Sequence, residues 1–131
     1  MDRIMDIEHK GKIIMYNDLS YCSPEEIMQA VAKSKELISH KQQGMVLTLT
    51  NVTGLHFNHE NLQIFKEWVT FNKPYVKAAA IIGLTGMLKI GYMFVINVTK
   101  RAIKEFDNQE EAIDWLVSWD NIDSKNISAV N

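Results

Sequence analysis

The stretch that decides the fold class is Val76-Lys77-Ala78-Ala79-Ala80-Ile81-Ile82. It is an almost continuous apolar run, which is typical of a strand covered on both faces, as in a parallel sheet between two helix layers. Asn72-Lys73-Pro74 precedes it and ends a helix, because the residue before proline avoids the helical region. Gly83-Leu84-Thr85-Gly86 follows it and leads into a very apolar helix from about Met87 to Lys100. A strand between two helices indicates an α/β protein.

The rest of the chain extends this alternation in both directions. Upstream, helical and strand periodicities predict a hairpin turning at Gly11, a helix capped by Ser23 with Pro24 and Glu26, a strand over Met45–Leu49, and a helix over His59–Phe71 capped by Asn58. Downstream, they predict a strand over Ile103–Phe106 and a last helix capped by Asp107. The predicted order is β-β-α-β-α-β-α-β-α, a mixed and mostly parallel sheet of four or five strands with about four helices.

Length and composition limit the domain count and several function classes. The 131 residues, of which 47% are apolar, suit one domain with one real core. We expect the domain to span residues 1–119, because residues 120–131 lack a sustained apolar period and suggest a flexible tail. The net charge of −2 argues against a nucleic-acid binder, and the single cysteine, Cys22, excludes an internal disulfide.

Two segments bear on location. Met1–Asp6 mixes charges of both signs and has no apolar core, so no signal peptide is predicted there. Ala78–Thr99 is interrupted only by Lys89 and is long enough to span a bilayer. Because it divides into a strand and a helix, we interpret it as two core elements. We expect a cytoplasmic protein that is not integral to a membrane, although peripheral lipid contact stays open.

Several strings resemble one family. They are Val46-Leu47-Thr48-Leu49-Thr50-Asn51-Val52-Thr53-Gly54, Asn72-Lys73-Pro74-Tyr75-Val76-Lys77, Gly83-Leu84-Thr85-Gly86 and Glu111-Ala112-Ile113-Asp114-Trp115-Leu116. Together they resemble the STAS-type, SpoIIAA-like proteins, which include bacterial anti-sigma-factor antagonists and share a superfamily fold with lipid-binding Sec14-like proteins. The resemblance implies a SpoIIAA-like fold used as a regulatory or ligand-binding module.

One feature of that family is tested residue by residue. In the antagonists, the loop after the central strand ends in an Asp-Ser pair at a helix start, and the serine is phosphorylated. Here the matching positions are Asn58 and His59, followed by Glu60, so no hydroxyl stands at the phosphorylated position. The resemblance therefore implies a regulatory module that binds a protein partner, or itself, without the serine switch. Its predicted contact residues are Asn51, Thr53, Asn58, His59 and Glu60.

The apolar segment from Met87 to Val98 carries the alternative function. A helix on the surface of a small domain should have a polar face, and Lys89 and Asn97 alone supply little of one. It is buried by neighbours, contacts a second protomer, or lines a pocket or membrane-facing surface for an apolar ligand. The last reading predicts a lipid or other apolar small-molecule binder with ligand contacts at Gly83, Thr85, Gly86, Met87, Lys89, Met93 and Phe94.

The remaining candidates predict no chemistry. His56 and His59 with Glu60 have an HxxH spacing, but a metal site usually needs three or four converging ligands. Cys22 lies beside a helix start without a base nearby in the sequence, so an inert buried thiol is the interpretation. We therefore expect no catalytic residues, no metal and no cofactor, and a protein that is not an enzyme.

Overall fold

The computed structural model describes residues 2–55, 58–86, 89 and 103–130, with side chains described through residue 119. Its strands are β1 (Ile4–His9), β2 (Lys12–Asp18), β3 (Val46–Asn51), β4 (Val76–Ile82) and β5 (Ile103–Phe106). Its helices are α1 (Pro24–Ile38), α2 (His59–Asn72) and α4 (Gln109–Val130). No helix of the described residues is both long enough and apolar enough to cross a bilayer.

The five strands form one sheet in the order β1-β2-β3-β4-β5. β1 and β2 are antiparallel, and every other neighbouring pair is parallel. The predicted hairpin and the mostly parallel sheet are therefore confirmed. The turn between β1 and β2 places Lys10 and Gly11 at φ values of 52° and 77°, a left-handed geometry that glycine adopts without steric cost.

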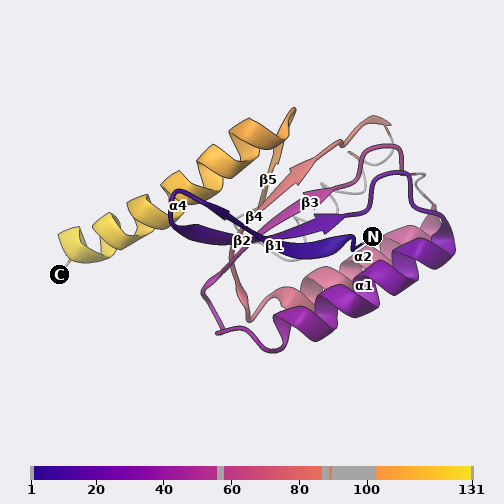
Figure 1. Cartoon of the computed structure of the whole chain (residues 1–131), viewed down its shortest axis with the longest axis horizontal. Coiled ribbons are helices and arrows are strands. Elements are labelled where there is room, and N and C mark those ends of the chain that lie inside the picture. The colour runs from indigo at the N-terminus through magenta and orange to yellow at the C-terminus, as the bar shows by residue number, and fades with distance from the viewer. Residues whose placement is uncertain (1, 56–57, 87–88, 90–102, 131) are drawn as a thin grey trace.

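Helices cover the sheet on both faces (Figure 1). α1 and α2 lie side by side on one face, where Ile27, Val31 and Trp68 pack with Met15 and Val46. α4 covers the other face, where Ile113, Leu116 and Val117 pack with sheet residues that include Leu49 and Ala80. Val76 and Ile81 of β4 pack against the first core and Ala78, Ala80 and Ile82 lie in the second, which explains the continuous apolar run of this strand.

The first helix begins as its sequence predicts. Ser23 Oγ accepts a hydrogen bond from the Glu26 N–H at 3.2 Å, and Glu26 Oε1 accepts one from the Ser23 N–H at 3.0 Å. These two bonds form the predicted capping box, and Pro24 occupies the first turn. α2 likewise begins after Asn58, whose Oδ1 accepts a hydrogen bond from the Asn61 N–H at 2.8 Å.

The last helix differs from its prediction at both ends. Its cap is Asn108 rather than Asp107, because Asn108 Oδ1 accepts a hydrogen bond from the Glu111 N–H at 2.9 Å and its carbonyl accepts one from Ala112. Both residues lie between the end of β5 at Phe106 and the start of α4 at Gln109, so Asn108 directly precedes the helix and its side chain reaches the free amide of the first turn. α4 also continues to Val130, through the residues expected to form a tail. The sequence has no glycine or proline from Gln109 to Val130, so this segment contains neither of the residues that most disfavour a helix.

Two other predictions have different outcomes. The expected helix from about Met87 to Lys100 lies outside the described residues except for Lys89, so the described helices number three. The helix predicted over His59–Phe71 ends one residue later, at Asn72; its Phe71 ring is 40% exposed, and its buried positions are Asn61, Trp68 and Asn72. α2 lies beside α1, and Phe71 packs on Tyr75 with the Lys35 ammonium over its ring.

Candidate functional site

The carboxyl ends of β2, β3 and β4 meet at one edge of the sheet, and backbone hydrogen bonds tie together the loops that follow them. The Leu19 N–H donates to Asn51 O at 2.8 Å, and the Tyr21 N–H donates to Thr53 O at 2.8 Å. The Val52 N–H donates to Ile82 O at 2.9 Å. Pairing thus continues past the strands, so these loops have one fixed arrangement at the edge where ligands of parallel sheets commonly bind.

Asn51 fixes the loop that follows the central strand. Its Oδ1 accepts hydrogen bonds from the Thr53 N–H at 3.0 Å and from the Thr53 hydroxyl at 2.6 Å. Its Nδ2 donates to the Tyr16 hydroxyl at 3.3 Å. This is an Asx turn anchored to the neighbouring strand. Both predicted residues are therefore brought together, and their polar groups hold the loop.

Two glycines in these loops allow close approach of backbone and side chain. Gly54 has φ 74°, and a methyl group there would overlap the Tyr21 ring. Gly83 has φ 89°, and a methyl group there would overlap the Thr53 backbone and hydroxyl. Both positions need glycine for conformation and for space. The glycine that opens the Gly83–Gly86 turn is thus explained by loop packing.

Tyr21 is the most exposed large hydrophobic side chain of the described residues, with 74% of its surface accessible. Its φ is 55°, a left-handed value that is uncommon for a bulky residue and marks positions worth functional attention. Arg3 supports the same loop, since its Nη1 donates to Ser20 O at 3.1 Å and to Asp18 O at 3.3 Å. We define the Tyr21 surface as Tyr21, Asn51, Thr53, Gly54 and the α2 start at Asn58, His59 and Glu60.

Tyr21 is not among the contact residues predicted from the sequence. Its neighbours Ser20, Cys22 and Ser23 predict a loop before a helix cap, which says nothing about a contact with Gly54. That contact depends on the register of β2 against β3, which places Asp18 opposite Asn51. The one sequence signal was an aromatic residue in a short loop at a strand's carboxyl end.

The start of α2 presents the other predicted contact residues. Asn58, His59 and Glu60 are all exposed, with Asn58 acting as the cap. His56 lies outside the described residues. Among those that are described, no three His, Cys, Asp or Glu side chains come together as a metal ion would require.

The residues of the alternative ligand site are only partly described. Thr85 and Gly86 are exposed, while Met87, Met93 and Phe94 lie outside the described residues. Lys89 Nζ lies 3.0 Å from Glu105 Oε1 on β5. The ammonium group of Lys89, which was predicted to contact a ligand, is therefore already paired with a carboxylate.

Cys22 follows Tyr21 in the sequence and belongs to the core beneath α1. It is 8% exposed, and burial raises the pKa of its thiol. A thiol with a raised pKa is poorly nucleophilic at neutral pH, which agrees with the inert thiol that the sequence predicts.

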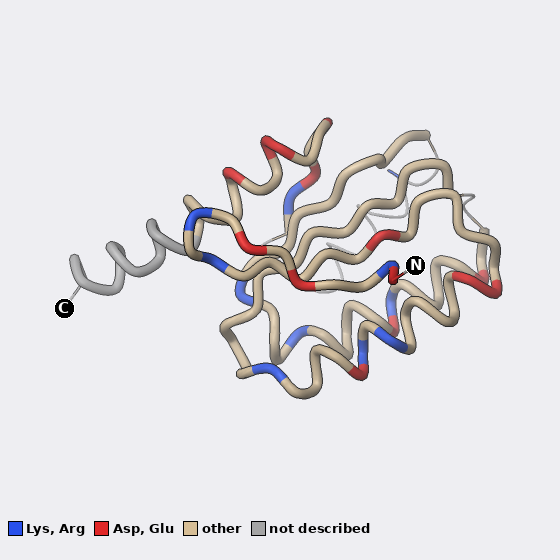
Figure 2. The backbone as a smooth tube through the Cα atoms, viewed as in Figure 1, with Lys and Arg blue, Asp and Glu red and all other residues tan. Residues whose placement is uncertain are grey.

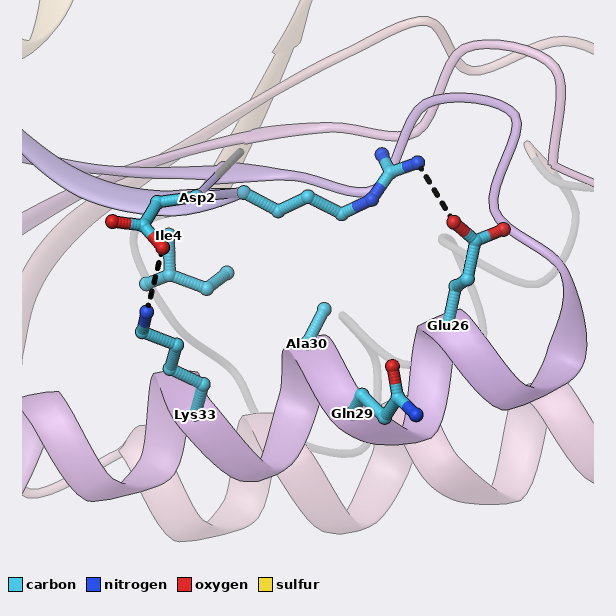
Figure 3. Close-up of a pocket in the computed structure, with 7 residues that line it drawn as sticks. Asp2, Ile4, Glu26, Gln29, Ala30 and Lys33 are labelled. Carbon is cyan, nitrogen blue, oxygen red and sulfur yellow. Dashed lines mark hydrogen bonds and ion pairs between the residues drawn. The ribbon is translucent and has the colours of Figure 1, made fainter.

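A separate cleft of about 250 Å³ lies between the start of β1 and α1 (Figure 3). Ile4 and Ala30 contribute apolar surface, and Gln29 lies between two ion pairs. Arg3 Nη2 lies 3.2 Å from Glu26 Oε2, and Lys33 Nζ lies 3.0 Å from Asp2 Oδ1. Hydrogen bonds to the Ser23 backbone and side chain, and then Arg3, lower the pKa of Glu26. Hydrogen bonding and charge from Lys33 lower the pKa of Asp2.

Comparison with known proteins supports the fold. No family model matches the chain, and no curated protein matches it. A solved structure of an uncharacterized protein of the DUF3478 family from Shewanella loihica PV-4, described as having a SpoIIAA-like fold, superposes with a TM-score of 0.68. The two share 16% sequence identity over 86% of this chain and 91% of the other. This likeness, the sheet order and the helix layers together show that the chain has a SpoIIAA-like fold.

Proposed function

We propose that this protein is a non-enzymatic regulatory module that binds a protein partner through the Tyr21 surface. The observation that carries the proposal is the exposed Tyr21 ring, held in a left-handed backbone conformation against Gly54. An aromatic side chain that is already ordered loses little entropy on binding, and tyrosine is enriched among the residues that dominate interface energies.

The rigidity of the neighbouring loops supports the same proposal. Three backbone hydrogen bonds and the Asn51–Thr53 turn fix the loops that carry Tyr21, Asn51 and Thr53 before a partner arrives. Pre-ordered surfaces bind without paying the cost of loop ordering. His59 and Glu60 extend the surface with polar groups, as expected for the rim around an aromatic contact.

The alternative, a lipid or other apolar ligand, rests mainly on Met87, Met93 and Phe94. The described part of that region gives it no specific support, because Gly83 is explained by loop packing and Lys89 is paired with Glu105. Native mass spectrometry of the freshly purified protein tests it. A co-purifying lipid would favour this alternative over the protein-binding function.

The proposal is tested by affinity capture from an extract of the source cells, followed by titration of the captured partner. We expect Tyr21→Ala and His59→Ala to weaken binding, with a loss of about tenfold or more for Tyr21→Ala. Met28→Ala is the matched control, because Met28 is 62% exposed on α1 and outside the Tyr21 surface. Light scattering separates a partner from self-association. A monomer that captures nothing, or binding unaffected by Tyr21→Ala and His59→Ala, would contradict the proposal.

A further inference from the structure

α1 and α2 begin at one end of the molecule and finish at the opposite end (Figure 1). α1 joins β2 to β3 and α2 joins β3 to β4, and both pairs of strands are parallel, so the two helices run in the same direction. An exposed aromatic ring lies at each end. Tyr21, which precedes α1, is 74% exposed, and Phe71, in the last turn of α2, is 40% exposed. The two rings therefore mark opposite ends of one helix layer.

The end that carries Tyr21 is acidic. Glu25 lies in the first turn of α1 and Glu60 in the first turn of α2, and both side chains are exposed. Neither carboxylate is paired with a basic group in the part of the chain that the structure describes. The guanidinium of Arg3 is already engaged, because its Nη2 lies 3.2 Å from Glu26 Oε2. Glu25 and Glu60 therefore leave negative charge available at this end.

The opposite end is basic. The Phe71 and Tyr75 rings stack with their centroids 6.2 Å apart, and Lys35 Nζ lies 5.4 Å from the Phe71 centroid. Lys73 is exposed just after α2, and among the described residues neither lysine forms an ion pair. Glu36, in the last turn of α1, offsets one of the two charges. We define the Phe71 surface as Phe71, Tyr75, Lys35 and Lys73. Figure 2 shows acidic positions where the two helices begin and basic positions around the turns that follow them.

We propose that copies of this chain associate head to tail, with the Phe71 surface of one copy bound to the Tyr21 surface of the next. Lys35 and Lys73 then face Glu25 and Glu60, and the aromatic rings supply apolar contact area. The proposal rests on the proposed function, because it uses the Tyr21 surface as a protein contact and adds that a second copy competes with the partner for it. Two different surfaces meet, so each added copy leaves one of each kind free, and the assembly grows as an open chain or closes as a ring.

Charge favours this arrangement over a symmetric dimer. In a symmetric contact each surface faces its own copy. Two Tyr21 surfaces would bring Glu25 and Glu60 against the same carboxylates, and two Phe71 surfaces would bring Lys35 and Lys73 against the same ammonium groups. Like charges across an interface are costly, whereas the head-to-tail contact pairs opposite charges.

Two charge-reversal variants test the contact: Glu25→Lys with Glu60→Lys, and Lys35→Glu with Lys73→Glu. Sedimentation of the wild-type chain should show a mass that rises with protein concentration and falls as salt is added, because salt screens exposed charges. Each variant alone should associate about tenfold more weakly or less, since both of its surfaces then carry the same charge, and an equimolar mixture of the two should recover the association.

The matched control is Glu110→Lys with Glu111→Lys, which makes the same charge change in the first turn of α4 and should associate as the wild type does. A monomeric wild type, association that salt leaves unchanged, reversal variants as strong as the control, or a mixture no stronger than its components would overturn the proposal. If lysine at the helix starts prevents folding, Glu25→Gln with Glu60→Gln should still weaken association, and no weakening would overturn it equally.

A second pair of variants tests which surfaces meet. Tyr21→Ala keeps the Phe71 surface intact, and Phe71→Ala keeps the Tyr21 surface intact. Each alone should be monomeric where the wild type assembles, and their equimolar mixture should form a heterodimer that grows no further. A mixture that forms no heterodimer, or that grows beyond it, would overturn the head-to-tail contact.

Partner binding reports on the proposed function separately, because Phe71→Ala should keep the captured partner and Tyr21→Ala should lose it. A wild type that stays monomeric while Tyr21→Ala loses the partner would contradict self-association alone. A heterodimer that forms while partner binding is unaffected by Tyr21→Ala and His59→Ala would contradict the proposed function alone.

Discussion

The Tyr21 ring lies so close to the backbone of Gly54 that a methyl group on Gly54 would overlap it. The contact joins the loop after β2 to the loop after β3 and orients an exposed aromatic side chain. It links the stability of the loops to the geometry of the proposed binding surface.

Gly54→Ala should therefore lower the free energy of unfolding by more than the cost of placing an alanine in a left-handed conformation. The conformational cost is about 1 kcal/mol, and the displaced ring adds to it. Gly44→Ala is the control, because Gly44 has φ 77° and no neighbour within 4 Å of an added methyl. Urea unfolding should show the larger loss for Gly54→Ala, and Tyr21→Ala in the same chain should recover the excess. Equal losses at the two glycines would show that the ring contact contributes nothing.

A buried polar network beneath α1 should be costly to break. The Ser34 hydroxyl donates to Asn17 Oδ1 at 3.0 Å, and Asn17 Nδ2 donates to Thr50 Oγ1 at 3.3 Å. Ser34 is 0% exposed and Asn17 is 1% exposed. Ser34→Ala leaves a buried acceptor without this donor, so the free energy of unfolding should fall by about 1–3 kcal/mol. Ser39→Ala, which removes an exposed hydroxyl at the end of the same helix, should cost far less.

The start of α4 gives a matched pair of cap variants. Asn108→Ala should lower the free energy of unfolding by about 1 kcal/mol, because it removes the acceptor of the Glu111 N–H. Asp107→Ala should have a much smaller effect. Thermal unfolding of both variants measures the difference. A larger loss from Asp107→Ala would place the cap where the sequence alone predicted it.

The capping box of α1 makes part of the stability depend on pH. Hydrogen bonds from Ser23, and then Arg3, lower the pKa of Glu26 in the folded state. A carboxyl group whose pKa is lower when folded stabilises the protein above its unfolded pKa, about 4.3, and this contribution is lost as pH falls through the folded pKa. Glu26→Gln should flatten the acid limb of the unfolding curve. An unchanged slope in Glu26→Gln would refute the assignment.

Local signals predicted most of the fold. The start of α1 is identified by three neighbouring residues, Ser23, Pro24 and Glu26. The bounds of β4 are those that its apolar run predicts. The order of helices and strands then allowed few sheet topologies, because crossovers between parallel strands are right-handed. The likeness to a solved SpoIIAA-like structure agrees with that result.

The features that sequence did not predict depend on distant contacts or on small differences in capping. The Tyr21–Gly54 contact and the Asn17–Ser34 bond join segments that only the folded sheet brings together. The choice of Asn108 over Asp107 depends on how many residues leave β5, and the continuation of α4 depends on the absence of a stop signal. Of the predicted contact residues, Asn51 and Thr53 hold the loop, whereas His59 and Glu60 are exposed.

The measurement that tests the central claim most directly is hydrogen exchange of the protein alone and bound to its captured partner. The account predicts slower exchange at Tyr21, over Asn51–Leu55 and at the first turn of α2, and no such protection with the Tyr21→Ala variant at the same concentrations. Protection confined to other elements, with the amides of these loops unchanged, would contradict the Tyr21 surface as the binding site.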